Sequence, residues 1–247
     1  MACILHIETS TDVCSVALSK DGFRVFEKED FSGPNHAERL GTYVEMAMKE
    51  AEEKELKLDA VAVSSGPGSY TGLRIGVSMA KGLCYGKDLK LVSIPTLQLL
   101  CVPVLLGDKI RCVKHVDGKT ENVETTMEDD ALLCPMIDAR RMEVFAAIYD
   151  RALGEVRETQ ADIVTEDTYR QFLDDHVVYF FGNGAEKCME TINHPNARYI
   201  NKVFPLAKNM MPLAEMRMRK GQTEDVAYFV PTYFKDYVAK MPKNLLK

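Results

Sequence analysis

The residues with the clearest chemical potential form a glycine-rich loop at the end of a short apolar run. The stretch SGPGSYTGLRIG spans residues 65–76 and leads into a segment that can be helical. Glycine loops that open a helix can hold phosphate through backbone N–H groups. However, no lysine follows Gly72 as in a Walker loop, and the third glycine comes one residue late for a dinucleotide fingerprint. The loop itself therefore predicts a tight turn, after which Ser69 or Thr71 can cap the helix.

Metal and nucleophilic chemistry have less support. A helical metal site needs ligands four residues apart, and Leu40 occupies that place after His36. The serines beside the glycine loop have no assignable base. The other histidines form no cluster: His6, His115, His176 and His194. We therefore predict no metal ligand and no catalytic residue.

Two runs of predicted elements follow the same order along the chain. In the first run we expect strands at 2–8, 13–19, 23–28, 60–63 and 89–94, with helices at 37–53, from 71 onward and at 96–100. In the second we expect strands at 132–138, 143–149, 155–163 and 177–181, with helices at 166–174, 185–192 and 206–219. The polar stretch 107–131 between them is consistent with a hairpin, an insertion or a partly disordered link.

Chemically similar positions recur in the two runs. The first strand of each ends in an acid, Glu8 or Asp138, and the fourth is followed by a glycine loop, 66–68 or 182–184. Such a duplication predicts an α/β protein of two similar βββαβα domains that face each other across a cleft. We place the domains at 1–103 and 104–247, with the last helix and the tail packing back on the first domain.

Composition restricts the class of protein. The 247 residues are 46% hydrophobic and 28% charged, with a net charge of -6, which is typical of a soluble globular protein and disfavours independent binding to a nucleic-acid backbone. The seven cysteines are widely spaced without a CxxC pair, which favours a reducing cytoplasm over a disulfide framework. We see neither a signal peptide nor an apolar run that could span a bilayer. We expect a cytoplasmic protein that has no membrane contact and reaches RNA only through a partner.

The two helices of the first domain carry faces that could meet a partner. The first has a widened apolar face, and the second has almost no side chain along one face, which would permit close helix packing. Arg74 near the start of the second helix opposes the helix dipole, and a carboxylate on a partner would explain it. The alternative is that this face packs inside the chain and that Arg74 is only solvated, and we give the two interpretations about even weight. The predicted interface comprises Leu40, Tyr43, Val44, Ala47, Met48, Thr71, Gly72, Arg74, Ile75, Gly76, Met79 and Ala80.

Several motifs taken together resemble one family. They are ETST at 8–11 followed by CSVAL, HAERL at 36–40, SGPGSYTGLRIG, and DARR at 138–141 followed by EVF. These are similar to the bacterial tRNA threonylcarbamoyladenosine biosynthesis proteins of the TsaB (YeaZ) family. The similarity covers most of the chain, and GPGSYTGLRIG is its most specific part. It implies the actin-like, Hsp70-like and sugar-kinase-like ATPase superfold, built from two ribonuclease-H-like halves.

The resemblance also implies a function. TsaB proteins are non-catalytic partners of their paralogue TsaD, which transfers a threonylcarbamoyl group to the adenosine beside the anticodon of tRNAs that decode ANN codons. The ATPase TsaE completes the assembly. The family implies pairing of TsaB with TsaD through two helices from each chain, and a homodimer through the same face when TsaD is absent. An older glycoprotease label for the family has no support from the residues above.

Candidate nucleotide contacts also follow from the ATPase superfold. Glu8 replaces the aspartate usual in such ATPases, and Ala139 and Arg140 replace a hydroxyl-rich turn. We therefore expect no tightly bound cofactor, with ATP or ADP only at an interface of the complex. The interpretation that these places are structural turns carries about twice the weight of a nucleotide site. The alternative function for the whole chain is a stand-alone ATPase, kinase or peptidase of the same superfold. The candidate contacts are Glu8, Thr9, Ser10, Gly182, Asn183 and Gly184.

The C-terminal residues are rich in aromatic and basic side chains. Tyr228, Phe229, Tyr233, Phe234 and Tyr237 are followed by Lys240, Lys243 and Lys247. We expect core packing and a frayed end, with contact to tRNA as the less favoured alternative.

Overall fold

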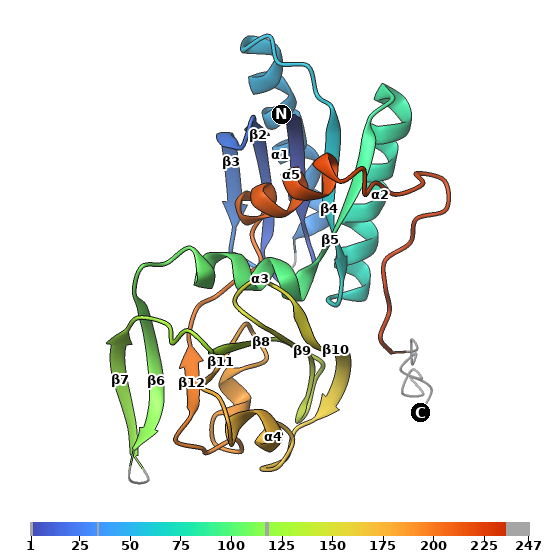
Figure 1. Cartoon of the computed structure of the whole chain (residues 1–247). Coiled ribbons are helices and arrows are strands. Elements are labelled where there is room, and N and C mark those ends of the chain that lie inside the picture. Colours follow the sequence, from blue (N-terminus) through green and yellow to red (C-terminus); the bar gives the residue numbers. More distant parts are fainter. Residues whose placement is uncertain (1, 34, 117–118, 236–247) are drawn as a thin grey trace, which may run out of the picture.

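Two β-sheets form the protein, and the computed structural model describes residues 2–33, 35–116 and 119–235 (Figure 1). The first sheet has five strands in the order β3-β2-β1-β4-β5. They are β1 (Cys3–Glu8), β2 (Cys14–Lys20), β3 (Phe23–Asp30), β4 (Ala60–Gly66) and β5 (Lys90–Pro95). β1 and β3 each pair antiparallel with β2, while β4 pairs parallel with β1. The antiparallel meander predicted for the first three strands is therefore confirmed.

Helices cover both faces of the first sheet because its central strands are apolar on both sides. α1 (His36–Glu53) and α2 (Tyr70–Lys87) pack on the face that carries Leu5 and Ile7. α3 (Thr96–Leu105) and α5 (Met211–Arg219) cover the opposite face, which carries Ile4 and Ala62. Side chains alternate along a strand, so a strand that is apolar at successive positions must be covered on both sides.

The second sheet has seven strands, and five of them repeat the order of the first. The order is β10-β9-β8-β11-β12-β6-β7. The strands are β6 (Ile110–Val116), β7 (Lys119–Thr125), β8 (Leu132–Asp138), β9 (Glu143–Tyr149), β10 (Glu155–Ile163), β11 (Val178–Phe181) and β12 (Ala197–Ile200). β8 stands where β1 stands in the first sheet, between an antiparallel neighbour, β9, and a parallel one, β11. The predicted duplication is therefore present.

α3 lies between the two sheets and is shared by them (Figure 1). Its Leu97 and Leu100 pack against the second sheet, whereas Leu99 and Val102 pack against the first. The domain boundary predicted at residue 103 thus falls inside a helix whose side chains serve both halves.

The helices of the second half are much shorter than predicted. α4 comprises only Arg170–Leu173 of the expected 166–174. Thr168 Oγ1 accepts a hydrogen bond from the backbone N–H of Thr165 at 2.7 Å, and this turn competes with helix at the start of the segment. The segment 185–192 contains only the 3₁₀ turn η1 (Glu186–Cys188). A segment this short gains too little from packing to offset the cost of helix nucleation.

Three other segments refine the predicted elements. The stretch 107–131 contains the hairpin of β6 and β7, which confirms the first of the three alternatives. β12 was not predicted, because four residues leave too little periodicity to detect. The helix expected at 206–219 begins as the 3₁₀ turn η2 (Ala207–Met210) before α5, since Pro212 lacks the N–H that would continue one α-helix.

Candidate functional site

Glu8, the acid at the end of β1, is buried among hydroxyl and amide groups. Its Oε1 accepts a hydrogen bond from the backbone N–H of Ser10 at 2.6 Å, and its Oε2 accepts one from the Ser64 hydroxyl. Burial raises the pKa of Glu8 to about 7, against the opposing effect of the hydrogen bonds from Ser10 and Ser64. The carboxyl group is therefore partly protonated near neutral pH.

The turn at Thr9 and Ser10 is sealed by the glycine loop and α2. The backbone N–H of Ser69 donates to Ser10 O at 2.7 Å, and Thr9 Oγ1 donates to Gly72 O at 2.8 Å. A Cβ on Gly72 would lie 2.1 Å from Thr9 O, and one on Gly68 would lie 2.4 Å from Ser10 O. These glycines permit close packing within the chain. Because Thr9 and Ser10 are each only 1% exposed, the turn offers no open cradle for a phosphate group.

The corresponding loop of the second half, 182–184, is also filled by the chain itself. A Cβ on Gly182 would lie 2.3 Å from a backbone oxygen of β8. The Asn183 side chain accepts a hydrogen bond from the backbone N–H of Asp138 at 2.9 Å, and the Asp138 carboxylate forms an ion pair with Lys187. The six predicted nucleotide contacts thus lie in two separate structural turns, and in this arrangement they do not fit a nucleotide phosphate.

Most of the interface predicted on α1 belongs to the core. Leu40, Tyr43, Val44 and Ala47 are buried against the first sheet, and Met48 packs partly buried beside them. The apolar face of α1 is wide because the helix contacts β2, β3 and α2 within the chain. The prediction that these four buried side chains meet a partner is therefore wrong.

The small-residue face predicted on α2 is internal as well. Gly72, Gly76 and Ala80 are buried. A Cβ on Gly76 would lie 2.3 Å from Thr9 Oγ1, so this face is occupied by the turn after β1. The prediction of a partner on this face is wrong, and the alternative of an internal packing face is confirmed. A substitution such as Gly76→Leu would disturb the fold before it tested docking.

The other predicted interface residues on α2 are accessible and line a shallow depression. Thr71 and Arg74 are exposed, while Ile75 and Met79 are half-buried. The depression has a volume of about 810 Å³ and lies between α2 and the start of α1. It is lined by Ala37, Tyr70, Thr71, Arg74, Ile75, Ser78, Met79, Gly82 and Leu83.

A second stripe of small residues on α2 faces solvent, and the sequence reasoning missed it. Ser78, Gly82 and Gly86 are spaced by four residues and are exposed. A Cβ on Gly82 or Gly86 would meet nothing within 4 Å, and the same holds for Gly41 on α1. Each glycine inside a helix costs about 1 kcal/mol relative to alanine. The spacing was visible in the sequence, but the choice between two such stripes was not.

Arg74 is held by aromatic rings of the same chain. The carbon at the centre of its guanidinium lies 3.9 Å from the centre of the Tyr70 ring, and Nε donates a hydrogen bond to Tyr233 Oη at 3.2 Å. A cation over an aromatic face is favoured electrostatically. These contacts within the chain account for the position of Arg74, and a carboxylate on a partner stays a prediction.

Two known proteins of the same name resemble this chain, one along nearly its whole length and one along about two thirds of it. The tRNA threonylcarbamoyladenosine biosynthesis protein TsaB of Escherichia coli K12 is 27% identical over 247 residues, covering 97% of this chain and 98% of that protein. The Bacillus subtilis 168 protein of the same name is 28% identical over 159 residues, covering 64% of this chain and 60% of that protein. This chain is a relative of TsaB.

Two further matches concern the fold of this TsaB relative and its similarity to TsaD. The crystal structure of an uncharacterized Pseudomonas aeruginosa protein with similarity to peptidase YeaZ matches with a TM-score of 0.75 at 21% identity, covering 95% of this chain and 100% of that one. A family model described as TsaD, tRNA N6-adenosine threonylcarbamoyltransferase, matches residues 30–126. That region contains α1 and α2. The solved structure and the repeated strand order confirm the predicted α/β fold of two duplicated halves.

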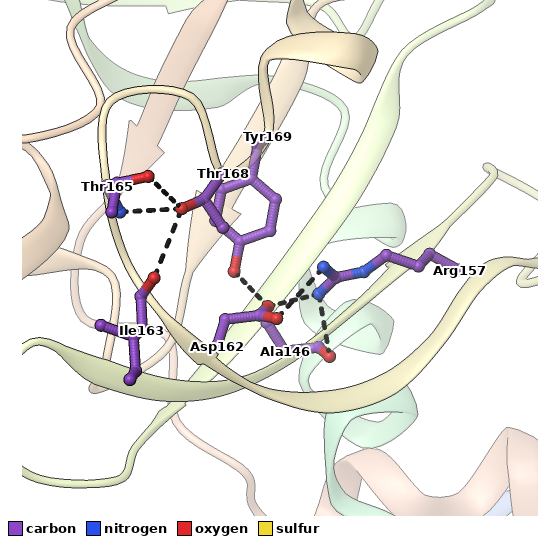
Figure 2. A network of polar contacts seen from close by, with 7 residues as sticks. All are labelled: Ala146, Arg157, Asp162, Ile163, Thr165, Thr168 and Tyr169. Carbon is purple, nitrogen blue, oxygen red and sulfur yellow. Dashed lines mark hydrogen bonds and ion pairs between the residues drawn. The ribbon is translucent and has the colours of Figure 1, made fainter.

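The TsaB relative also contains a buried polar network in its second half (Figure 2). The Arg157 guanidinium pairs with both carboxylate oxygens of Asp162 and donates to Ala146 O at 3.4 Å. The Tyr169 hydroxyl donates to Asp162 Oδ2 at 2.7 Å. The network joins β9, the irregular strand β10 and the turn before α4. Apart from Arg157 Nε, which is buried without a hydrogen-bond partner, the polar groups named here bind one another, and we assign the network a structural role.

Metal and membrane sites can be assessed for the described residues alone. Across 2–33, 35–116 and 119–235, no three or more His, Cys, Asp and Glu side chains are grouped so that they could hold a metal ion. Within the same part of the chain, no helix has both the length and the apolar character that crossing a bilayer requires.

Proposed function

We propose that this TsaB relative is a non-catalytic partner of TsaD in the threonylcarbamoyl modification of the adenosine beside the anticodon in tRNAs that decode ANN codons. TsaE would join the same assembly, tRNA would be reached only through the complex, and the chain would form a homodimer in isolation. The observation that carries the proposal is the exposed face of α1 and α2, where Gly41, Gly82 and Gly86 have open space around them. Helices keep such glycines at a cost, and close approach of another helix would offset it.

The arrangement of the acids supports a non-catalytic role. Glu8 is fully buried and lies under a sealed turn, and Asp138 is paired with Lys187. A stand-alone ATPase, kinase or peptidase would need a reactive group beside an open substrate site, and neither acid is placed in that way. ATP or ADP at the interface of the complex stays a prediction.

The cysteines support the cytoplasmic location that we propose. All seven thiols are free and buried. Burial raises the pKa of the Cys14, Cys84 and Cys188 thiols to about 11, which keeps them protonated and unreactive at neutral pH. Because these thiols form no disulfides, an oxidising compartment would not stabilise this chain through disulfide bonds.

The proposal is tested by size-exclusion chromatography with light scattering on the purified chain, alone and mixed with TsaD from the same organism. We expect a homodimer that exchanges into a one-to-one heterodimer. Gly82→Arg should weaken both associations at least about tenfold, because a long side chain would separate the helices. Gly107→Arg is the matched control, since a Cβ there would make only ordinary contacts and Gly107 lies after α3.

Two outcomes would contradict the proposal. A wild-type chain that remains monomeric and ignores TsaD would remove the partner role. Magnesium-dependent ATP hydrolysis by the chain alone, abolished by Glu8→Ala, would show an enzyme instead.

A further inference from the structure

The residues 224–235, which we call the C-terminal strap, run from the edge of the first sheet along α2 toward the second sheet (Figure 1). The strap starts where the backbone N–H of Glu224 donates to Leu91 O at 2.8 Å, at the free edge of β5. Farther along, the backbone N–H of Thr232 donates to Ser65 O at 2.8 Å, at the end of β4. Phe234 then reaches Phe145 of β9, with ring centres 6.2 Å apart.

The strap is anchored to the side of α2. Lys81 Nζ donates to Ala227 O at 3.1 Å and to Phe229 O at 2.9 Å. Phe229 and Val226 also pack against the core of the first half. Val226 and Phe229 are half-buried, whereas Tyr228 and Val230 are exposed to solvent.

The outward side chains of the strap are large and apolar. Tyr228 is 83% exposed and Val230 is 67% exposed, and Tyr85 at the end of α2 is 87% exposed. Tyr85 and Ala227 line one shallow depression with Gly82 of the exposed small-residue stripe. The start of the strap therefore adjoins the exposed face of α2 at this depression, which Lys81 and Asp225 also line.

The strap also positions Arg74. The Tyr233 ring packs on Tyr70 with centres 4.9 Å apart, and the guanidinium of Arg74 is 3.9 Å from the Tyr70 ring centre and 5.9 Å from that of Tyr233. Two rings and one hydrogen bond restrict a side chain that would otherwise sample many rotamers. The exposed guanidinium is thus held in place before any partner arrives, which lowers the entropic cost of using it in an interface.

The area of α1 and α2 is too small for a stable interface by itself. Each helix has 18 residues. A helix of that length is about 27 Å long and about 10 Å wide, so two of them present roughly 500 Å². A specific interface needs about 800 Å² from each partner. The strap is the neighbouring surface that can supply the difference.

We propose that the C-terminal strap is a second part of the docking face. This inference rests on the function proposed above. The TsaD partner that lies on α1 and α2 also covers Tyr228, Val230 and Tyr233, and it contacts Arg74, whose side chain is already held in position. The partner surface that fits is apolar, with an acceptor, best a carboxylate, opposite the guanidinium.

The test measures the dissociation constant for TsaD by isothermal titration calorimetry on full-length variants whose thermal unfolding matches the wild type. Tyr233→Ala should weaken binding roughly tenfold, because it removes both the ring and the hydroxyl that hold Arg74. Tyr233→Phe, which keeps the ring, should cost only about two- to threefold. Tyr228→Ser removes an outward ring without touching the anchors, and it tests the strap even where a Tyr233 variant folds poorly. Phe23→Ser is the control, because Phe23 is 77% exposed on β3, at the opposite edge of the first sheet.

The outcomes separate this proposal from the proposed function. Unchanged affinity in the strap variants, together with loss of binding in Gly82→Arg, would overturn the role of the strap and leave the partner function standing. Tighter binding would show that the strap obstructs the face, and weaker self-association alone would assign the strap to a second copy of this chain. Either result overturns the proposal. Absence of binding by the wild type would overturn both.

Discussion

The two halves of this protein share one strand order but differ in their helices. α1 and α2 of the first half have 18 residues each, whereas the second half keeps α4 with four residues and η1 with three. Both sheets are nonetheless covered and have well-packed cores. The difference shows that short turns suffice to cover a sheet of this kind, so the long helices of the first half exceed what the fold requires. Their outer face is where we place the partner.

The halves also treat buried acids in different ways. Glu8 of the first half is surrounded by hydroxyl and amide groups, whereas Asp162 of the second half is paired with Arg157 and receives the Tyr169 hydroxyl. Burial raises the pKa of Glu8, which has no cationic partner in this network, whereas the Asp162 carboxylate has Arg157 as its ion-pair partner. The first acid therefore makes stability sensitive to pH, and the second makes it sensitive to loss of its partner.

The largest effect on stability is expected when a methyl group is added to the buried face of α2. Gly72→Ala should lower the free energy of unfolding by about 4 kcal/mol, because the new Cβ would lie 2.1 Å from the backbone oxygen of Thr9. Urea unfolding followed by circular dichroism measures the change. In the same helix, Gly82→Ala should stabilise by up to about 1 kcal/mol, since open space surrounds that position. Equal effects at the two positions would show that the faces of α2 are assigned incorrectly.

Removing the cation from the second half should have the next largest effect. Arg157→Met leaves Asp162, whose side chain is 9% exposed, without its charged partner, and should cost about 3 to 4 kcal/mol of unfolding free energy. The measurement is again urea unfolding at neutral pH. Arg151→Met is the control, because it breaks an ion pair with the fully exposed Asp129 and should change stability by less than about 0.5 kcal/mol. A small effect at Arg157 would mean that the network in Figure 2 does not hold the second half together.

Titration of Glu8 should give the smallest effect of the three. Its pKa is raised to about 7 in the folded chain from an ordinary value of 4.5, so the folded state binds the proton more tightly than the unfolded state. Stability should therefore fall as pH rises from about 4.5 to about 7, by about 2 to 3 kcal/mol, and then level off. Glu8→Gln should remove this component when unfolding curves at pH 5 and pH 8 are compared with those of the wild type.

Much of the fold could be predicted because it depends on local patterns. The strands of the first half, both of its long helices and the first three strands of the second half are strongly periodic or continuously apolar. They were expected within three residues of their observed bounds, except that no end was predicted for the second helix. The short helices of the second half were overpredicted, because side-chain hydrogen bonds such as that of Thr168 outweigh helical periodicity over so few residues.

The candidate site was less predictable than the fold. The exposed residues Thr71 and Arg74 and the half-buried Ile75 and Met79 were expected, and they line the observed depression. Leu40, Val44 and Gly76 were placed on the same interface but are buried. An apolar or glycine-rich helical face has the same sequence pattern whether it packs on its own sheet or on another chain.

The duplicated strand order, the position of the glycine loops and the relationship to TsaB follow from composition and spacing along the chain. Which side of α2 is buried does not, because it depends on how distant segments pack together. The helix carries two small-residue stripes of equal spacing, Gly72-Gly76-Ala80 and Ser78-Gly82-Gly86. The turn at Thr9 lies against the first stripe, whereas the second faces solvent. That difference depends on a contact between residues more than 60 positions apart.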